Sequence, residues 1–106
     1  MYSKFGQFIE GKWQPSSNNE TYDVINPATE EKLSRVAEAD GQDVDLAVRS
    51  ARNAYKKVWS KLPAKERGKY IYRIARLIQE RSREFSILES LDGGKPIRES
   101  RDIDIP

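Results

Sequence analysis

The sequence predicts a mixed α and β fold in which a β-hairpin and further short strands precede three to four helices. Short β-prone stretches separated by turn-forming residues fill the first 39 positions, and apolar residues then recur at helical spacing from residue 40 onward. The chain has 106 residues, of which 37% are hydrophobic and 34% charged. This length suits one small domain or part of a larger one. Without an internal repeat or an obvious linker, no domain boundary is expected within residues 1–106.

The first predicted element is a hairpin around Glu10-Gly11, flanked by Phe8 and Trp13. A glycine at this point can take the positive φ that a tight turn needs. A polar loop follows, and the stretch TYDVINP (residues 21–27) then predicts a strand that the Asn26-Pro27 pair ends as a turn. The stretch EKLSRVAEA (residues 31–39) is the third extended segment.

The first helix is expected from Asp40 to about Ser60. Asp40 can cap the free N–H groups of a first turn that also carries Asp43 and Asp45. Apolar residues then recur three and four positions apart, which predicts one apolar stripe along the helix. The stripe consists of Val44, Ala47, Val48, Ala51, Tyr55 and Val58.

Proline and glycine set the limits of the later helices. Pro63 is expected in the first turn of a second helix that runs to about Arg81, with a buried stripe of Ile71, Ile74, Ala75 and Ile78. Ser82 is expected to cap a third helix, with Phe85, Leu88 and Leu91 facing inward. The Gly93-Gly94 pair can supply the left-handed residue that ends this helix, and Pro96 starts a fourth.

The composition excludes several kinds of site. The chain has no cysteine and no histidine, which rules out a disulfide, a thiolate zinc site and an imidazole general base within it. Any metal must then be bound by oxygen ligands, which suit hard cations. No apolar run approaches the roughly 20 residues of a membrane helix, and no secretory signal is recognisable. We therefore expect a cytoplasmic location and no membrane partner.

Positive charge is concentrated in the middle of the sequence. Residues 49–83 carry 12 Lys and Arg against 2 Asp and Glu, a net charge of +10, although the whole chain has a net charge of only +2. Such a segment can attract nucleic acid or anionic surfaces. Because apolar residues interrupt it at helical spacing, a solvated helix face is the favoured interpretation, and we expect no nucleic acid partner.

No active site is visible in the residue patterns. The stretch Gly93-Gly94-Lys95 resembles part of a phosphate-binding loop, but Pro96 follows the lysine where Ser or Thr is required, so a helix corner is favoured. Three carboxylate pairs occur, and all lie in polar surroundings, which favours capping or solvated acids over acid–base catalysis. They are Glu30/Glu31, Asp43/Asp45 and Asp102/Asp104.

Several stretches in order nevertheless resemble the N-terminal region of the aldehyde dehydrogenase superfamily. They are FIEGKW, INPATEE, VAEADGQDVDLAVRSARNAYKKVWSKLPAKERGKYI, RLIQERSREFSILESLDGGKP and RDIDIP. The resemblance covers the chain from about Phe8 to Pro106. It implies an α/β, Rossmann-like fold of the aldehyde dehydrogenase type, with residues 1–106 as an incomplete N-terminal part of its cofactor-binding domain.

The resemblance also implies a function for the full-length parent. Members of this family oxidise an aldehyde to a carboxylic acid with NAD or NADP, using a Cys nucleophile and a Glu that activates water. Neither catalytic residue lies in this segment of the family, so no catalytic and no cofactor-binding residue is assigned here, and no cofactor is expected for the fragment alone. The partners implied are the remainder of the dehydrogenase chain or homologous subunits, with the aldehyde bound only by the full-length parent.

One site is implied residue by residue. Many members bind a structural monovalent cation through main-chain carbonyls, which correspond here to Val24, Ile25 and Asp92. Oxygen ligands suit Na⁺ or K⁺. The remaining ligands lie outside the matched segment, so the site would be incomplete in this chain.

Two positions depart from the family pattern. Gly93 stands where the family most often has Asn, and Glu30 stands where it usually has Gly, so another turn type is expected at Glu30.

Two other functions stay open. The chain could be a non-catalytic remnant that binds a dehydrogenase subunit, or a basic helical module that binds nucleic acid or anionic surfaces.

Overall fold

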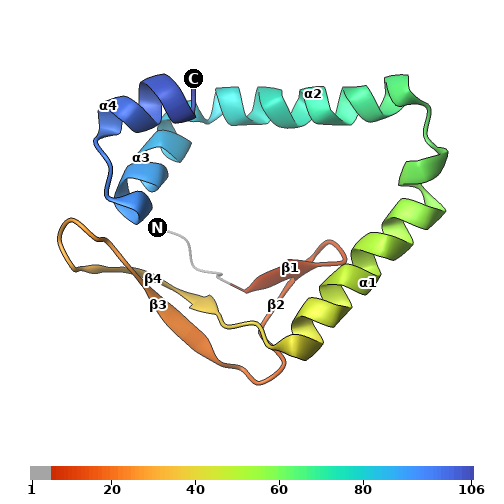
Figure 1. Cartoon of the computed structure of the whole chain (residues 1–106), viewed down its shortest axis with the longest axis horizontal. Helices are drawn as coiled ribbons and strands as arrows, with labels where there is room; N and C mark the ends of the chain where they lie inside the picture. The colour runs from red at the N-terminus through yellow and green to blue at the C-terminus, as the bar shows by residue number, and fades with distance from the viewer. Residues whose placement is uncertain (1–5) are drawn as a thin grey trace. The chain divides into compact units, whose positions relative to one another are not determined.

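The computed structural model describes residues 6–106, and Figure 1 shows its strands and helices in chain order. The strands are β1 (Gln7–Ile9), β2 (Lys12–Gln14), β3 (Thr21–Ile25) and β4 (Lys32–Ala37). The helices are α1 (Gly41–Lys57), α2 (Ala64–Glu80), α3 (Ser82–Gly93) and α4 (Ile97–Glu99). A 3-10 turn η1 (Trp59–Lys61) follows α1, and a π-helical turn η2 (Ser100–Asp104) follows α4. The predicted order of hairpin, short strands and four helices is confirmed.

Strands β1 and β2 form the predicted antiparallel hairpin. Phe8 pairs with Trp13 across it, and their ring centroids are 5.2 Å apart. Glu10 and Gly11 have φ of 55° and 76°, so both turn residues are in the left-handed region. Two such residues give a turn whose twist matches that of the flanking strands. The glycine at the second position therefore makes this tight connection possible.

The N-terminus of α1 is held by a capping box. The Asp40 carboxylate accepts from the N–H groups of Gln42 and Asp43 at 2.8 and 3.0 Å, and the Asp43 carboxylate accepts from the Asp40 N–H at 3.1 Å. Each carboxylate satisfies a donor that the first helical turn leaves without a partner. The prediction that Asp40 caps this helix is confirmed.

The same two carboxylates bind the loop after β2. The Ser17 N–H donates to both oxygens of Asp43 at 3.1 Å, and the Ser17 hydroxyl donates to Asp40 at 2.6 Å. These bonds, first that of the Ser17 hydroxyl and then those of the first-turn N–H groups, lower the pKa of Asp40 below its ordinary value. Asp43 is buried, so the loop and the helix start are joined through a hydrogen-bonded acid.

Two expectations about the helices are wrong. Ser82 does not cap α3: it is the first helical residue, and Arg81, with φ −112° and ψ 19°, takes the position before it. A single residue separates α2 from α3, which leaves no extended residue whose side chain could reach the free N–H groups. Pro63 precedes α2 as its N-cap and does not lie within the first turn.

The apolar stripe of α2 is not buried. Ile71, Ile74 and Ile78 are 61%, 58% and 38% exposed, Ala75 is exposed as well, and no residue of this helix is buried. Phe85 of α3 is also exposed, and Leu88 and Leu91 are only half-buried. Helical periodicity identifies which side of a helix is apolar, but the described residues supply no layer that covers this side.

The contacts among the described residues group into two units. One consists of residues 6–24 and 34–62 and contains the β1–β2 hairpin, most of β3 and β4, α1 and η1. The other consists of residues 25–33 and 63–106 and contains the turn between β3 and β4, α2, α3, α4 and η2. Between residues 6 and 106 the buried hydrophobic residue is Ile9, and the buried polar residues are Ser16, Asn26, Asp43, Ser86 and Ser100. The described residues thus bury more polar than apolar side chains.

Candidate functional site

The C-terminal end of α3 forms a corner against the turn that follows β3. Gly94 has φ 71° and ψ 10°, and its N–H donates to the Ser90 carbonyl at 3.0 Å, which confirms the predicted left-handed helix end. A Cβ on Gly94 would lie 2.7 Å from Cγ of Pro27. Glycine is therefore required here both by the backbone conformation and by the close approach of the proline ring.

Lys95 joins the end of α3 to the turn η2. Its Nζ lies 2.8 Å from Glu89 Oε1 and 2.7 Å from Asp104 Oδ2. The hydrogen bond to Asp104, and after it the one to Glu89, raises the pKa of Lys95 above its ordinary value. The ammonium group is thus already held between two carboxylates. This arrangement favours the helix-corner interpretation over a phosphate-binding loop.

Serine hydrogen bonds hold the turn η2 on α3. The Ser90 hydroxyl donates to the Ser100 hydroxyl at 2.9 Å, and Ser100 is fully buried. The N–H of Ile105 donates to the Ser100 carbonyl at 2.9 Å, the wider spacing of a π-helical turn. The corner is therefore held by hydrogen bonds and ion pairs more than by apolar packing.

The turn after β3 has an ordered backbone. The Asn26 side-chain oxygen accepts from the Ala28 N–H at 2.9 Å, and the main chain of Asn26 is bonded to both Glu30 and Glu31, at 2.8 and 2.9 Å. Glu30 has φ 61°. Glu30 thus takes the left-handed conformation that a glycine adopts without strain. The backbone at Glu30 is therefore strained.

The predicted cation ligands lie on these two segments. Val24 and Ile25 are the last two residues of β3, and Asp92 is an exposed residue in the last turn of α3. The contact between Gly94 and Pro27 lies two residues from Asp92 and two from Ile25. In a helix the Asp92 carbonyl would accept from residue 96, which is a proline without an N–H. That carbonyl oxygen is consequently suited to an external partner.

Three acids of the predicted carboxylate pairs have structural partners. Asp43 belongs to the capping box, Asp104 is paired with Lys95, and Asp102 is paired with Arg101. The bonds from Arg101 lower the pKa of Asp102 below its ordinary value, and those to Asp102 raise the pKa of Arg101. Within the described part of the chain, no three acidic, His or Cys side chains gather where they could hold a metal ion.

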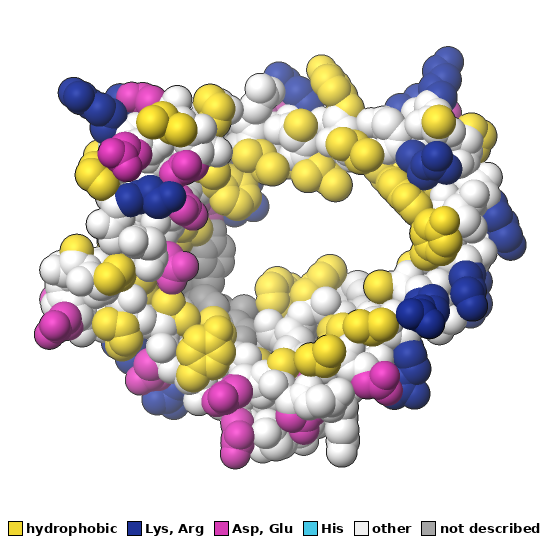
Figure 2. All heavy atoms as spheres, in the orientation of Figure 1, with side chains coloured by type: hydrophobic (Ala, Val, Ile, Leu, Met, Phe, Trp, Pro, Cys, Tyr) yellow, Lys and Arg dark blue, Asp and Glu magenta, His cyan; other side chains and the backbone are white. Residues whose placement is uncertain are grey.

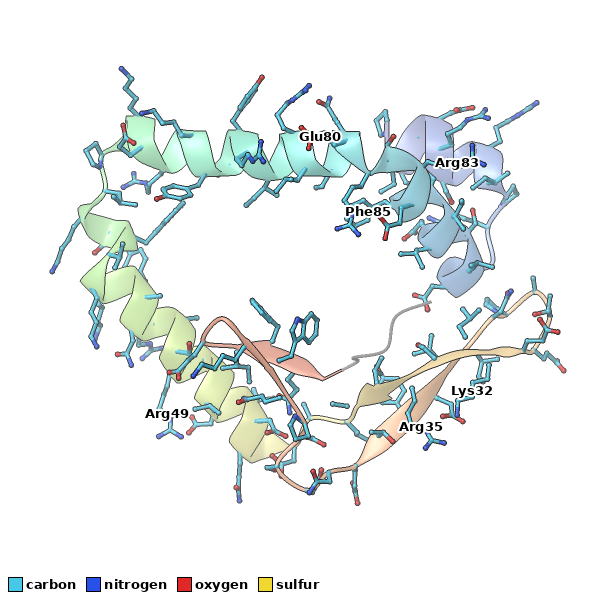
Figure 3. The ribbon with its side chains drawn as sticks, turned by 180° about the vertical axis from the view of Figure 1, so that it is seen from behind. Lys32, Arg35, Arg49, Glu80, Arg83 and Phe85 are labelled. Carbon is cyan, nitrogen blue, oxygen red and sulfur yellow. The ribbon has the colours of Figure 1, made fainter. Side chains whose placement is uncertain are left out.

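Part of the basic segment is neutralised within its own helices. Arg49, labelled in Figure 3, lies 2.8 Å from Asp45 one turn away on α1. Lys69 and Arg81 pair in the same way with Glu66 and Glu84, at 2.8 and 2.7 Å. All these side chains are well exposed. Pairs at this spacing are typical of a solvated helix face.

One depression, in the unit that contains the hairpin, was not predicted from the sequence. It has a volume of about 450 Å³, and Trp13, Glu20 and Arg35 are among its lining residues. Arg35 pairs with Asp23 at 3.1 Å across β3 and β4. No sequence signal pointed to this depression because its lining residues come from four separate segments of the chain.

No helix formed by residues 6–106 is both long and apolar enough to cross a membrane.

Relatives of similar sequence, two of which follow, are considerably longer than this chain. The profile of the aldehyde dehydrogenase family matches residues 13–106. Aldehyde dehydrogenase [NAD(P)+] 2 of Saccharomyces cerevisiae is 39% identical over 100 residues, which are 94% of this chain and 20% of the yeast protein. Cytosolic aldehyde dehydrogenase 1 of Elephantulus edwardii is 44% identical over 90 residues, 83% of this chain and 18% of that protein. The chain thus spans about a fifth of the length of these relatives.

The backbone also matches solved structures of this family. One is a cysteine-to-alanine mutant of the P. syringae AldA indole-3-acetaldehyde dehydrogenase in complex with NAD⁺ and IAA. It is 36% identical, with a TM-score of 0.94, and the match covers all of this chain and 22% of that chain. The short strands and the four helices therefore recur within a much longer dehydrogenase chain. Profile, sequence identity and backbone agree, and the chain belongs to the aldehyde dehydrogenase family.

Proposed function

We propose that residues 1–106 form the N-terminal part of the cofactor-binding domain of an NAD(P)-dependent aldehyde dehydrogenase and act there as scaffold. The observation that carries this proposal is the match of almost the entire chain to one fifth of much longer family members. The full-length protein would oxidise an aldehyde to a carboxylic acid. Because this chain has no cysteine, the covalent step must use a nucleophile from the rest of the protein.

The second part of the proposal concerns a monovalent cation. The main-chain carbonyls of Val24, Ile25 and Asp92 would supply part of its ligands, and the remainder of the dehydrogenase chain would supply the others. The Gly94–Pro27 contact and the missing N–H of Pro96 support this assignment. Such a partial set of neutral oxygens should bind Na⁺ or K⁺ negligibly by itself. Saturable binding by the isolated chain in sodium NMR would contradict this.

A chimera tests the scaffold function. In it, residues 1–106 replace the matching segment of AldA, the relative whose backbone this chain matches over its full length. We expect the chimera to form NADH from indole-3-acetaldehyde and NAD⁺, and the isolated chain to show neither turnover nor tight NAD⁺ binding. The control is AldA without the replaced segment, which should be inactive.

The two halves of the test can fail separately. A soluble chimera that makes no NADH would argue against the scaffold function. NADH formation by the purified chain alone, with any aldehyde, would show that the proposed division between scaffold and catalysis is wrong. An active chimera with an inactive isolated chain is the expected pair of results.

A further inference from the structure

We propose that Lys95 is a positioning residue for the proposed monovalent cation, because it fixes the Asp92–Gly93 peptide whose carbonyl oxygen would be one of the ligands. This inference rests on the proposed function and adds a residue to its cation site. Lys95 together with its two carboxylate partners, Glu89 and Asp104, forms what we call the Lys95 bridge. Figure 2 shows acidic side chains gathered over α3 and α4, with basic side chains among them.

The Lys95 bridge spans the end of α3. Glu89 lies in the last part of this helix, and Asp104 is the last residue of the turn η2. The Nζ of Lys95 is 2.8 Å from Glu89 Oε1 and 2.7 Å from Asp104 Oδ2. The lysine side chain thus links a residue before the Asp92–Gly93 peptide to a residue after it. Moving this peptide would stretch at least one of the two ion pairs.

The stem of Lys95 lies beside Gly93. A Cβ on Gly93 would be 3.5 Å from Lys95 Cε and 3.9 Å from Glu89 Oε1, which are ordinary contact distances. Gly93 supplies the nitrogen of the peptide that carries the Asp92 carbonyl. The next residue, Gly94, is in close contact with Pro27. Lys95 and Pro27 therefore restrain the two residues that follow the proposed ligand.

The Asp92 carbonyl needs such a restraint. In a continuing helix it would accept from residue 96, but Pro96 has no N–H, so the helical ladder does not orient this oxygen. Groups that orient metal ligands without touching the metal contribute strongly to affinity. Lys95 is placed to act in this way on a main-chain ligand.

Positioning and simple charge predict opposite effects of removing Lys95. An ammonium group close to a bound cation repels it, so a lysine that acted through its charge alone would weaken binding, and its removal would tighten binding. A lysine that holds the Asp92–Gly93 peptide in place strengthens binding, and its removal weakens it. The sign of the change therefore distinguishes the two roles.

Three variants of the AldA chimera test the inference. Lys95→Met keeps a long stem but loses both ion pairs, and Lys95→Arg keeps a donor for the two carboxylates. Lys69→Met is the matched control, because Lys69 Nζ lies at the same distance of 2.8 Å from a carboxylate, that of Glu66 on α2. The measurement is the midpoint of thermal unfolding as a function of K⁺ concentration, with choline chloride keeping the ionic strength constant.

We expect the K⁺ concentration that gives half of the maximal stabilisation to rise by roughly tenfold for Lys95→Met and by less than about twofold for Lys69→Met. Lys95→Arg should restore most of the affinity. If Lys95→Met prevents folding of the chimera, Lys95→Gln provides the graded version. Its amide can still donate to one carboxylate, so a smaller rise in the same direction is expected.

Four other results would each decide against part of this account. An unchanged or lower K⁺ requirement of Lys95→Met would overturn the inference. A fall in the unfolding midpoint that is equal with and without K⁺ would also overturn it, because Lys95 would then stabilise the fold alone. An unfolding midpoint of the unsubstituted chimera that does not depend on K⁺ would overturn both the inference and the proposed cation site. A folded but inactive chimera would contradict the scaffold function only, because the K⁺ titration does not require activity.

Discussion

Gly94 and Pro27 are in contact so close that a single methyl group on the glycine would collide with the proline ring, at 2.7 Å from its Cγ. This contact joins the end of α3 to the turn after β3. The carbonyl ligands proposed for a cation lie on either side of it. The variants of Gly94, Glu30 and Asp43 are best measured in the AldA chimera, because the apolar sides of the helices are open in the isolated chain.

Gly94→Ala should destabilise the chimera by about 2–4 kcal/mol, because an alanine is strained in the left-handed region and its Cβ must displace Pro27. Thermal unfolding would measure the loss. Gly93→Ala is the matched control. There the nearest atom to an added Cβ is Lys95 Cε at 3.5 Å, and the residue is helical, so the change should be neutral or slightly stabilising. Equal losses for both variants would show that the close approach does not matter.

Glu30→Gly should stabilise the chimera by about 1 kcal/mol, because Glu30 has φ 61° and glycine adopts that conformation without strain. The measurement is the shift in the denaturation midpoint. Ala28→Gly, two residues earlier in the same turn, should have no such benefit, since Ala28 has no positive φ. A destabilising Glu30→Gly would mean that contacts of the Glu30 side chain outweigh the backbone strain.

Asp43→Ala should lower the free energy of unfolding by about 1–3 kcal/mol, because it leaves the N–H groups of Ser17 and Asp40 without their acceptor. Asp45→Ala removes only an exposed ion pair to Arg49 and should cost less than about 0.5 kcal/mol. Chemical denaturation of the two variants would compare them. Similar losses would indicate that the buried position of Asp43 contributes nothing of its own.

The isolated chain should be helical but without a fixed core, and should self-associate. Ile9 is its buried hydrophobic residue between positions 6 and 106, while the apolar sides of its helices are open. Open apolar surface of this kind binds hydrophobic dyes and promotes association. Dye fluorescence and sedimentation velocity would test this. A monomer with sharp, dispersed amide NMR signals would contradict it.

Local elements were predictable because short-range chemistry determines them. Glu10-Gly11 specified the hairpin turn, Asp40 specified the start of α1, and Gly94 specified the end of α3. In each case the deciding interaction lies within a few residues of the signal. The prediction for Ser82 was wrong because a capping residue must itself be extended, whereas the short junction with α2 makes Ser82 the first helical residue.

The sequence by itself thus determined the order of the elements, the apolar side of each helix and the family. The tertiary structure decided what those elements touch. It brought Gly94 against Pro27 and placed Lys95 between Glu89 and Asp104. It also left no residue of α2 buried within residues 6–106. The physical reason is that periodicity records which side of a helix avoids water, whereas burial depends on residues far away in the chain.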